Sequence, residues 1–321
     1  MSTAATKIVR LRNRQAAGPA RKRWRDLREH AIHLLLLAAA LSSVLITAAI
    51  VGVLLVESAG FFREVSIVEF LTGTRWTPLY SDPSYGILPL LFATLVTTGV
   101  ALAVALPLGT IIAIYLSEFA PFIVREFLKP TLELLSAVPT VVYGFFALQV
   151  VSPALRWVLG GLSLGAIELP LQNMLSAGIV MGIMIIPYVS SLSEDAMRSV
   201  PMLLREGSYA LGGNKLLTAL RVVLPSALSG IGAAYILGIS RAIGETMIVA
   251  VVTGTEARLT LNPLDAAQTI TAYIVSVFDG ELVYGSTQFR SIFAAGLVLF
   301  AMTLLFNILG YQLRRRFHQA Y

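Results

Sequence analysis

Residues 86–117 have the sequence GILPLLFATLVTTGVALAVALPLGTIIAIYLS, and none of these side chains is charged. A helix needs about 20 consecutive apolar residues to cross the hydrocarbon core of a bilayer, so this run can cross with an extra turn at each end. A soluble core would instead show periodic apolar stripes interrupted by charges. The stretch therefore predicts a membrane-spanning helix.

The rest of the chain also has the composition of a membrane protein. Of its 321 residues, 56% are hydrophobic and 13% are charged, whereas soluble domains carry about a quarter charged residues. Five more runs can span a bilayer, namely 34–56, 134–155, 169–193, 226–256 and 291–313. The run 266–278 is too short to cross and predicts a short interfacial or re-entrant helix. We therefore expect an all-α membrane protein with six transmembrane helices.

The basic residues between these runs predict the orientation. Cytoplasmic loops of membrane proteins carry an excess of Lys and Arg. With the N-terminus inside, 18 of the 24 Lys and Arg residues lie on inner segments, five on outer segments and one, Arg241, inside a span. The inner segments are 1–33, 118–133, 194–225 and 314–321, and the outer ones are 57–85, 156–168 and 257–290. Both termini are therefore predicted to be cytoplasmic.

This layout leaves little room for enzyme chemistry. We divide the chain into a basic N-terminal segment (1–33), a first span with its outer segment (34–85), a transmembrane domain (86–313) and a basic tail (314–321). The sequence has no cysteine, and its three histidines lie near the chain ends. A thiolate or a histidine-based metal or haem centre within the membrane is thereby excluded. A membrane enzyme or redox subunit is disfavoured, and a membrane anchor without transport stays as an alternative.

The fifth run carries two charges, Arg241 and Glu245, in its interior. Ionisable residues are costly at a helix centre, so they mark functional sites by default. Their i, i+4 spacing predicts that both lie on one helix face, where they pair with each other or face a central cavity. The functional interpretation is that Arg241 attracts or passes an anion while Glu245 positions it or completes a gate. The structural alternative is an ion pair that joins two helices.

The polar segment 194–225 contains small residues at a regular spacing. Glu206-Gly207-Ser208 is followed by Gly212, and Leu224-Pro225 closes the segment. The small side chains leave one face of a short helix open to close contact, and Gly212 with Gly213 ends that helix. Pro225 suits the first turn of the next span. Such a helix is suited to docking in a partner's groove, and the alternative is a loop helix that only stabilises the bundle.

This pattern resembles the EAA motif of binding-protein-dependent ABC importer permeases, the MetI-like family. Glu206, Gly212, Leu224 and Pro225 match the motif, Val222 is a conservative replacement, and Gly207 and Ser208 replace its two alanines. The resemblance implies a type I ABC importer permease bundle. It also implies that these residues couple the chain to an ATPase subunit.

A second resemblance narrows the family. The stretches 115–121 (YLSEFAP), 137–146 (AVPTVVYGFF) and 241–246 (RAIGET) are similar to PstC-type permeases of phosphate importers. The resemblance covers roughly 86–256 and implies that Arg241 and Glu245 belong to the translocation path. It further implies three partners: a second, PstA-like permease subunit, a PstB-like ATPase dimer and a periplasmic, PstS-like phosphate-binding protein.

Energy and substrate selection are expected to come from those partners. The chain has no Gly-x-x-x-x-Gly-Lys-Ser/Thr sequence, so it lacks a P-loop for ATP. We expect it to be no enzyme and to bind no cofactor or metal, with ATP and Mg²⁺ used by the ATPase. We also expect no high-affinity phosphate site in this bacterial inner-membrane subunit. Phosphonate, sulfate or molybdate as the substrate, or the role of the sister subunit, remain alternatives.

Two prolines are candidate hinges. Pro139 and Pro187 are predicted to interrupt the third and fourth spans, because a proline frees a carbonyl and kinks a helix. They would then either flex during the inward–outward switch or impose fixed kinks that shape the bundle.

Overall fold

The computed structural model describes residues 19–78, 80–162, 169–278, 280 and 283–317, so parts of both predicted terminal segments lie outside the described residues. The described residues form helices, joined by loops that include one isolated bridge between Trp76 and Tyr85. The chain divides into two compact units, 1–56 and 57–321, and each is described by itself. The all-α prediction is therefore confirmed.

The helices of the described residues follow one another along the chain. They are α2 (Pro19–Phe61), α3 (Ile67–Thr72), α4 (Leu88–Ile114), η1 (Tyr115–Phe119), α5 (Phe122–Ser136), α6 (Thr140–Phe146), η2 (Ala147–Val151), α7 (Ser152–Leu162), α8 (Met174–Arg198), α9 (Met202–Ala210), α10 (Lys215–Thr218), η3 (Ala219–Val223), α11 (Leu224–Ser226), α12 (Leu228–Ile243), α13 (Met247–Val252), α14 (Ile270–Phe278) and α15 (Thr287–Phe317). The η elements are π-helical turns. The first unit contains α2 up to Val56, and its apolar side chains are exposed, as suits a helix surrounded by lipid.

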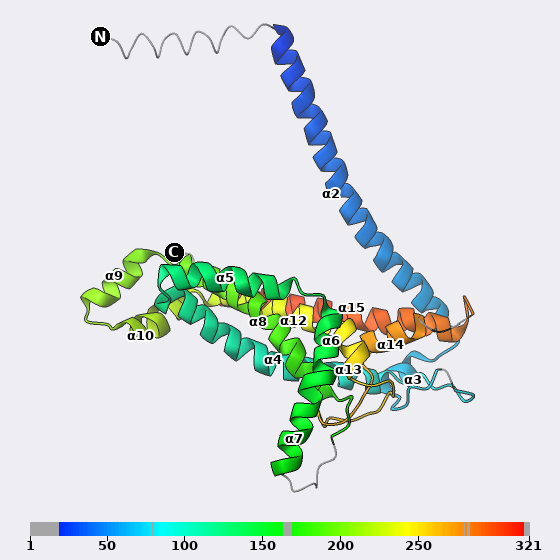
Figure 1. Cartoon of the computed structure of the whole chain (residues 1–321). Helices are drawn as coiled ribbons and strands as arrows, with labels where there is room; N and C mark the ends of the chain where they lie inside the picture. Colours follow the sequence, from blue (N-terminus) through cyan, green and yellow to red (C-terminus); the bar gives the residue numbers. More distant parts are fainter. Residues whose placement is uncertain (1–18, 79, 163–168, 279, 281–282, 318–321) are drawn as a thin grey trace, which may run out of the picture. The chain divides into compact units, whose positions relative to one another are not determined.

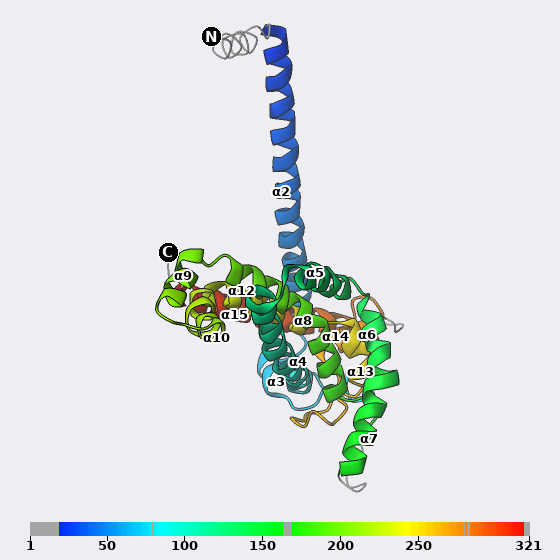
Figure 2. The same ribbon diagram turned by 60° about the vertical axis from the view of Figure 1, so that its left-hand side comes forward.

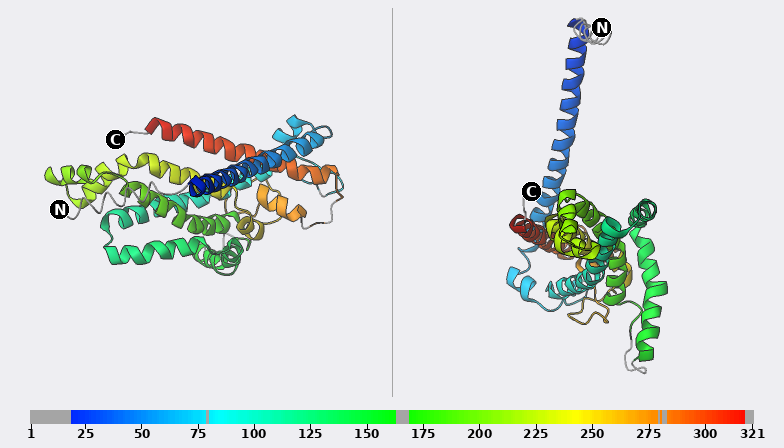
Figure 3. Two further views of the ribbon diagram at one scale, coloured as in Figure 1. Left: turned by 90° about the horizontal axis from the view of Figure 1, so that it is seen from above. Right: turned by 90° about the vertical axis from the view of Figure 1, so that its left-hand side faces the viewer.

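A bundle of α4, α8, α12 and α15 forms the centre of the second unit (Figure 1). Helices α4 and α8 approach closely because α8 carries glycines at the contact. A Cβ added at Gly178 would lie 2.6 Å from Val100, and one at Gly182 would lie 2.8 Å from the Ala101 carbonyl oxygen. Small residues of this kind let helix backbones pack tightly in membranes. The α9–α10 end of the bundle lies opposite the α3 end (Figure 3).

Five of the described helices are long and apolar enough to cross a membrane, and a bent pair provides a sixth candidate. Four of them confirm predicted spans: α2 contains 34–56, α4 with η1 contains nearly all of 86–117, α8 contains most of 169–193 and α15 contains 291–313. The run 266–278 contains α14, which at nine residues is too short to span, as predicted. The predicted orientation of the termini stays a prediction.

The third predicted span, 134–155, begins in the wrong place. Its first three residues belong to α5, which ends at Ser136, and the apolar helix starts at Thr140. Pro139 lies in the break as the N-cap of α6, so it interrupts the predicted run, but it ends one helix segment before the next and does not kink a continuous helix. A proline disfavours helical backbone in the residue before it, which explains why the helix stops there. Helices α6 and α7 run across the bundle (Figures 2 and 3).

The fifth predicted span, 226–256, is broken twice. The segment Lys215–Ser226 meets α12 at an angle of 71°, so α12 starts at Leu228, after the bend. Its other end is Ile243, and α13 resumes at Met247. Pro225 therefore lies in the first turn of the short α11, before the bend, and not in the first turn of the span itself.

An aromatic cluster packs the segment between α2 and α4 onto the end of the bundle. Phe61, Phe70, Trp76 and Tyr85 are buried, and the Trp76 and Tyr273 rings meet edge to face with centroids 5.0 Å apart. Edge-to-face contacts of this kind add stability beyond the burial of area. The described residues between α2 and α4, predicted to lie outside, are therefore a packed part of the second unit.

Candidate functional site

The break between α12 and α13 separates the two charges of the fifth predicted span. Gly244 is the C-cap of α12, and Thr246 is the N-cap of α13. Glycine favours helix ends because it costs conformational entropy inside a helix. The Thr246 hydroxyl donates to the Gly244 carbonyl at 3.1 Å and stabilises the turn. Glu245 is thus placed between two helices and not on the face of one.

The Glu245 carboxylate caps the start of α13. Its Oε1 accepts hydrogen bonds from the backbone N–H groups of Met247 at 3.1 Å and Ile248 at 3.3 Å. The residue is 8% exposed, and its backbone carbonyl accepts a bond from the Thr271 hydroxyl of α14 at 2.8 Å. Free N–H groups at a helix start carry partial positive charge, which a carboxylate neutralises. This capping explains how a carboxylate is kept at the break.

Arg241 lies in the last turn of α12 without an ionic partner among the described residues. Its guanidinium carbon lies 5.0 Å from the centroid of the Tyr188 ring, near the middle of α8. Its Nε is buried and has no hydrogen-bond partner within the described part of the chain. The placement of Arg241 and Glu245 on one helix face, predicted from the i, i+4 spacing, is therefore wrong, and the alternative in which they pair is not seen. Glu245 instead binds the free N–H groups that the helix break creates.

Together these contacts place an incompletely satisfied cation in the middle of the bundle. A buried donor nitrogen without a hydrogen bond is costly, and a ring face recovers only part of that cost. An anion that reaches Arg241 would supply the missing acceptor. The arrangement therefore suits transient attraction of an anion, whereas a closed Arg241–Glu245 pair would have neutralised it.

The predicted docking helix is α9, and its outer face is open. Glu206 and Gly207 are exposed, and a Cβ added at Gly207 would meet nothing within 4 Å. Leu203 is 78% exposed beside them. An exposed apolar surface around a single charge is typical of a protein–protein contact. Ser208, in contrast, faces inward, and its hydroxyl lies 2.8 Å from that of Thr218.

Gly212 and Gly213 follow the end of α9, as predicted from the sequence. Gly212 has φ of +83°, a left-handed conformation that glycine adopts without strain. Its N–H donates to the Tyr209 carbonyl and that of Gly213 to the Ser208 carbonyl, each at 2.9 Å. Leu224 packs against the buried cluster around Val223, which holds the end of this segment on the bundle. The ATPase-coupling role of these residues stays a prediction.

Sequence reasoning missed two ionic clusters at the α9 end of the bundle. In the first, Glu194 of α8 is fully buried, with Arg125 Nε at 2.9 Å and Lys129 Nζ at 2.7 Å. Burial alone would lower the pKa of Lys129, but hydrogen bonds to Asp195 and Glu194 raise it overall. The second cluster joins Glu118 to Arg205 at 3.0 Å. The sequence shows these charges, but only the Lys and Arg residues were used, and only to predict orientation.

Pro187 lies inside α8 and is buried, as predicted for the fourth span. It lines a cavity of about 190 Å³ together with Tyr188, Ser191 and Glu133. The cavity places the proline beside the ring that Arg241 covers, so a change in the bend of α8 would move that ring. Its role as a hinge, like that of Pro139, stays a prediction.

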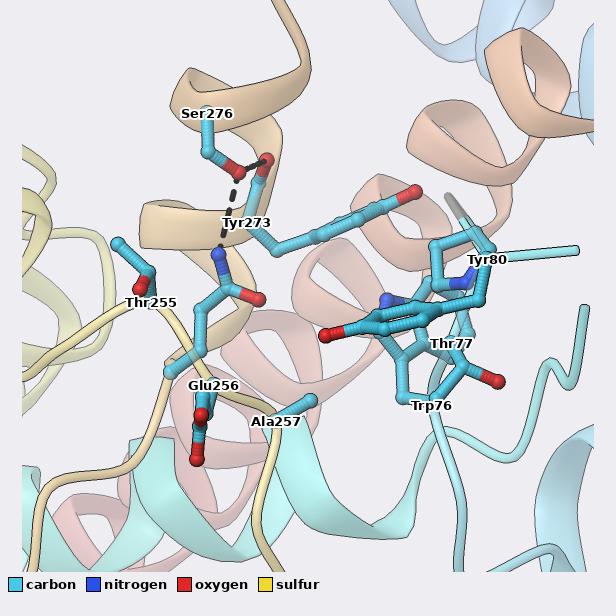
Figure 4. A pocket seen from close by; sticks show the side chains of 10 residues that line it. Trp76, Thr77, Tyr80, Thr255, Glu256, Ala257, Tyr273 and Ser276 are labelled. Atoms are coloured by element: carbon cyan, nitrogen blue, oxygen red, sulfur yellow. Dashed lines mark hydrogen bonds between the residues drawn. The ribbon is translucent and has the colours of Figure 1, made fainter.

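A second cavity, of about 430 Å³, lies at the α3 end of the bundle. Trp76 and Tyr80 lie on one side of it and Thr255 and Glu256 on the other (Figure 4). Its lining includes a carboxylate and contains no Lys or Arg among the described residues. Anion sites in proteins are lined by positive groups or N–H donors, so this cavity is poorly suited to an anion.

Comparisons with known proteins agree with this architecture. Residues 105–320 match the family described as "Binding-protein-dependent transport system inner membrane component". The chain is 39% identical over 246 residues to the "Probable ABC transporter permease protein YqgH" of Bacillus subtilis, covering 76% of this chain and 77% of that protein. It is 32% identical over 289 residues to the "Phosphate transport system permease protein PstC" of Mesorhizobium japonicum, covering 85% of this chain and 87% of that protein.

Solved structures show the same fold. A bacterial ABC transporter involved in the import of alginate matches with a TM-score of 0.63 and 15% identity, covering 93% of this chain and all of that chain. The MetNI methionine ABC transporter in an inward-facing conformation matches with a TM-score of 0.53 and 17% identity. The match covers 73% of this chain and 95% of that chain. The chain therefore belongs to the family of binding-protein-dependent transport system inner membrane components and is a multi-pass permease of the ABC importer type.

Proposed function

We propose that this permease forms half of the path by which inorganic phosphate enters the cell. A second, PstA-like permease would complete the path, a PstB-like ATPase dimer would supply the energy with its own ATP and Mg²⁺, and a PstS-like binding protein would deliver the substrate. In this proposal both termini of the chain are cytoplasmic, and α9 faces the ATPase.

The observation that carries the proposal is the state of Arg241. Its Nε is buried without an acceptor, and the nearest predicted counter-ion, Glu245, is committed to the start of α13. A single cation in mid-span lowers the entry barrier for a phosphate anion, and weak binding at one group permits release. The relatives named as phosphate permeases support phosphate as that anion.

The surroundings of Arg241 favour passage of phosphate over tight binding of phosphate. Tight phosphate sites combine several N–H donors or guanidinium groups around the anion. Among the described residues, Arg241 has the Tyr188 ring as a neighbour, and the cavity of about 430 Å³ at the α3 end is lined by Glu256 and no cation. Substrate selection is accordingly assigned to the binding protein.

The test is a phosphate-dependent ATPase assay of the complete complex in proteoliposomes. The complex, reconstituted with its binding protein and ATP, should hydrolyse ATP faster with phosphate than with sulfate or phosphonate, and labelled phosphate should accumulate in parallel. Equal stimulation by sulfate or phosphonate would replace phosphate with another oxyanion. A chain that is recovered without an ATPase and gives no uptake would favour the membrane anchor.

A further inference from the structure

Arg205 projects from α9 toward the bundle and makes contacts with two other elements. Its NH2 lies 3.0 Å and its Nε 3.5 Å from the two carboxylate oxygens of Glu118, a side-on contact through both oxygens. Its NH1 donates to the Val200 carbonyl at 2.6 Å, and NH2 also donates to the Met197 carbonyl at 2.9 Å. The guanidinium thus binds a carboxylate and two backbone oxygens at once.

The two ends of this contact belong to different parts of the bundle. Glu118 lies in η1, the π-helical turn that continues α4. Met197 lies in the last turn of α8, and Val200 in the bend just after it. Carbonyl groups at a helix end carry partial negative charge and lack partners within the helix, so a guanidinium there is stabilising. Arg205 therefore fastens α9 to the inner ends of α4 and α8.

The Arg205–Glu118 pair is shielded from water, so solvent weakens its ionic contact little. The side chains of Arg205 and Glu118 are 11% and 6% exposed, and the Ser117 hydroxyl donates a further bond to Glu118 at 2.9 Å. Exposed ion pairs contribute little because water screens them, but removing one partner of a buried pair leaves an uncompensated charge. Because the guanidinium is planar and its donors are fixed in a fork, such a contact fixes both the distance between the two side chains and their relative orientation.

Within the described residues, no other α9 side chain has a hydrogen bond or ion pair to η1 or α8. The Ser208 hydroxyl binds Thr218 of α10, and the α9 end contacts its own turn. Apolar contact is supplied by Leu204, which packs on the cluster around Met197 and Val223. Packed side chains and hydrogen-bonded or ionic contacts of this kind carry energetic coupling between distant sites. Among the described residues of α9, the polar contacts to η1 and α8 are made by Arg205.

We propose that the Arg205–Glu118 pair, with the Arg205 bonds to the end of α8, transmits movement of α9 to the helices that line the path. The inference rests on the proposed function, because α9 must contact the ATPase for the pair to have anything to transmit. Arg205 acts as a positioning residue that contacts neither phosphate nor ATP. It is adjacent to Glu206, which points outward, so one helix turn carries both the docking face and its link to the bundle.

The test measures phosphate transported per ATP hydrolysed by the complete reconstituted complex. Glu118→Gln and Arg205→Gln should leave complex recovery unchanged but lower this ratio about fivefold or more, the lower range for coupling between sites. Glu118→Gln/Arg205→Gln should be no worse than the more severe single variant, because both changes break one contact. A purely structural role would reduce the amount of complex and both rates together, and would leave the ratio unchanged.

Arg125→Gln is the matched control. It removes one partner of the neighbouring Glu194 cluster, which retains Lys129 and does not contact α9 among the described residues. Its ratio should equal that of the unaltered complex. A wild-type ratio in both single variants, or an equal loss in Arg125→Gln, would overturn the inference. A complex that shows no phosphate-driven ATPase activity even without substitutions would instead contradict the proposed function.

Discussion

Arg241 and Arg205 are two partly buried arginines with opposite surroundings. Arg205 binds Glu118 and two carbonyl oxygens at the α9 end of the bundle. Arg241 lies over the Tyr188 ring in mid-bundle and keeps a buried Nε without an acceptor. Both lie on helices that end nearby, and a carboxylate is close in sequence to each.

The difference shows what each guanidinium can do. A guanidinium such as that of Arg205, with four hydrogen bonds, holds elements together, and an additional anion would have to compete with those bonds. A guanidinium with an unused donor in a low-dielectric environment attracts an anion instead. Because the Glu245 carboxylate binds the N–H groups at the start of α13, Arg241 keeps its unused donor. The helix break is therefore as important for the candidate site as the charges are.

The largest effect is expected from Arg241→Gln. A unit charge about 4 Å from an anion is worth ~4 kcal/mol at protein surfaces, so phosphate uptake should fall ~100-fold or more. Complex recovery and binding of the ATPase should not change, because Arg241 has no ionic partner to leave unpaired among the described residues. Uptake by proteoliposomes provides the measurement, with Arg241→Lys as a charge-retaining control. Normal uptake in Arg241→Gln would leave Arg241 with a structural role.

Glu206→Lys tests the outward neighbour of Arg205. Glu206 is exposed, and no hydrogen bond or ion pair holds it within the described residues. A reversed charge at a docking surface should cost roughly 1.4 kcal/mol or more, which lowers recovery of the ATPase about tenfold or more. Co-purification from membranes gives the result. Glu126→Lys in α5 provides a control reversal outside the docking helix, and equal losses in both variants would contradict specific docking by α9.

Two substitutions of Glu245 distinguish its role as a helix cap from a role that requires its negative charge. If its main role is to accept the N–H bonds of Met247 and Ile248, Glu245→Gln retains one oxygen acceptor and should lower uptake only a few-fold. Glu245→Ala removes the acceptor and should lower uptake further and reduce thermal stability of the complex. Uptake and stability measured together separate the cases. A complete loss in Glu245→Gln with normal stability would show that the negative charge itself is required.

Sequence reasoning found the spans because charge-free length decides which segments can enter lipid. It identified Arg241 and Glu245 because buried charges are rare in membranes. It could not predict that the helix breaks at Gly244, since an i, i+4 spacing assumes an unbroken helix. Nor could it pair Glu118 with Arg205, because 87 residues separate them and only the packed fold brings them together.

The smallest effect is expected at Tyr188, the ring that lies beneath Arg241. A cation over an aromatic face gains roughly 0.5–2 kcal/mol, so Tyr188→Leu should release Arg241 and change the phosphate concentration for half-maximal uptake several-fold. Tyr188→Phe keeps the ring face and should behave like the unaltered protein. Initial uptake rates across a phosphate series resolve such changes. If Tyr188→Phe is as impaired as Tyr188→Leu, the hydroxyl and not the ring positions Arg241, and the contrast with Arg205, which makes four hydrogen bonds, becomes weaker.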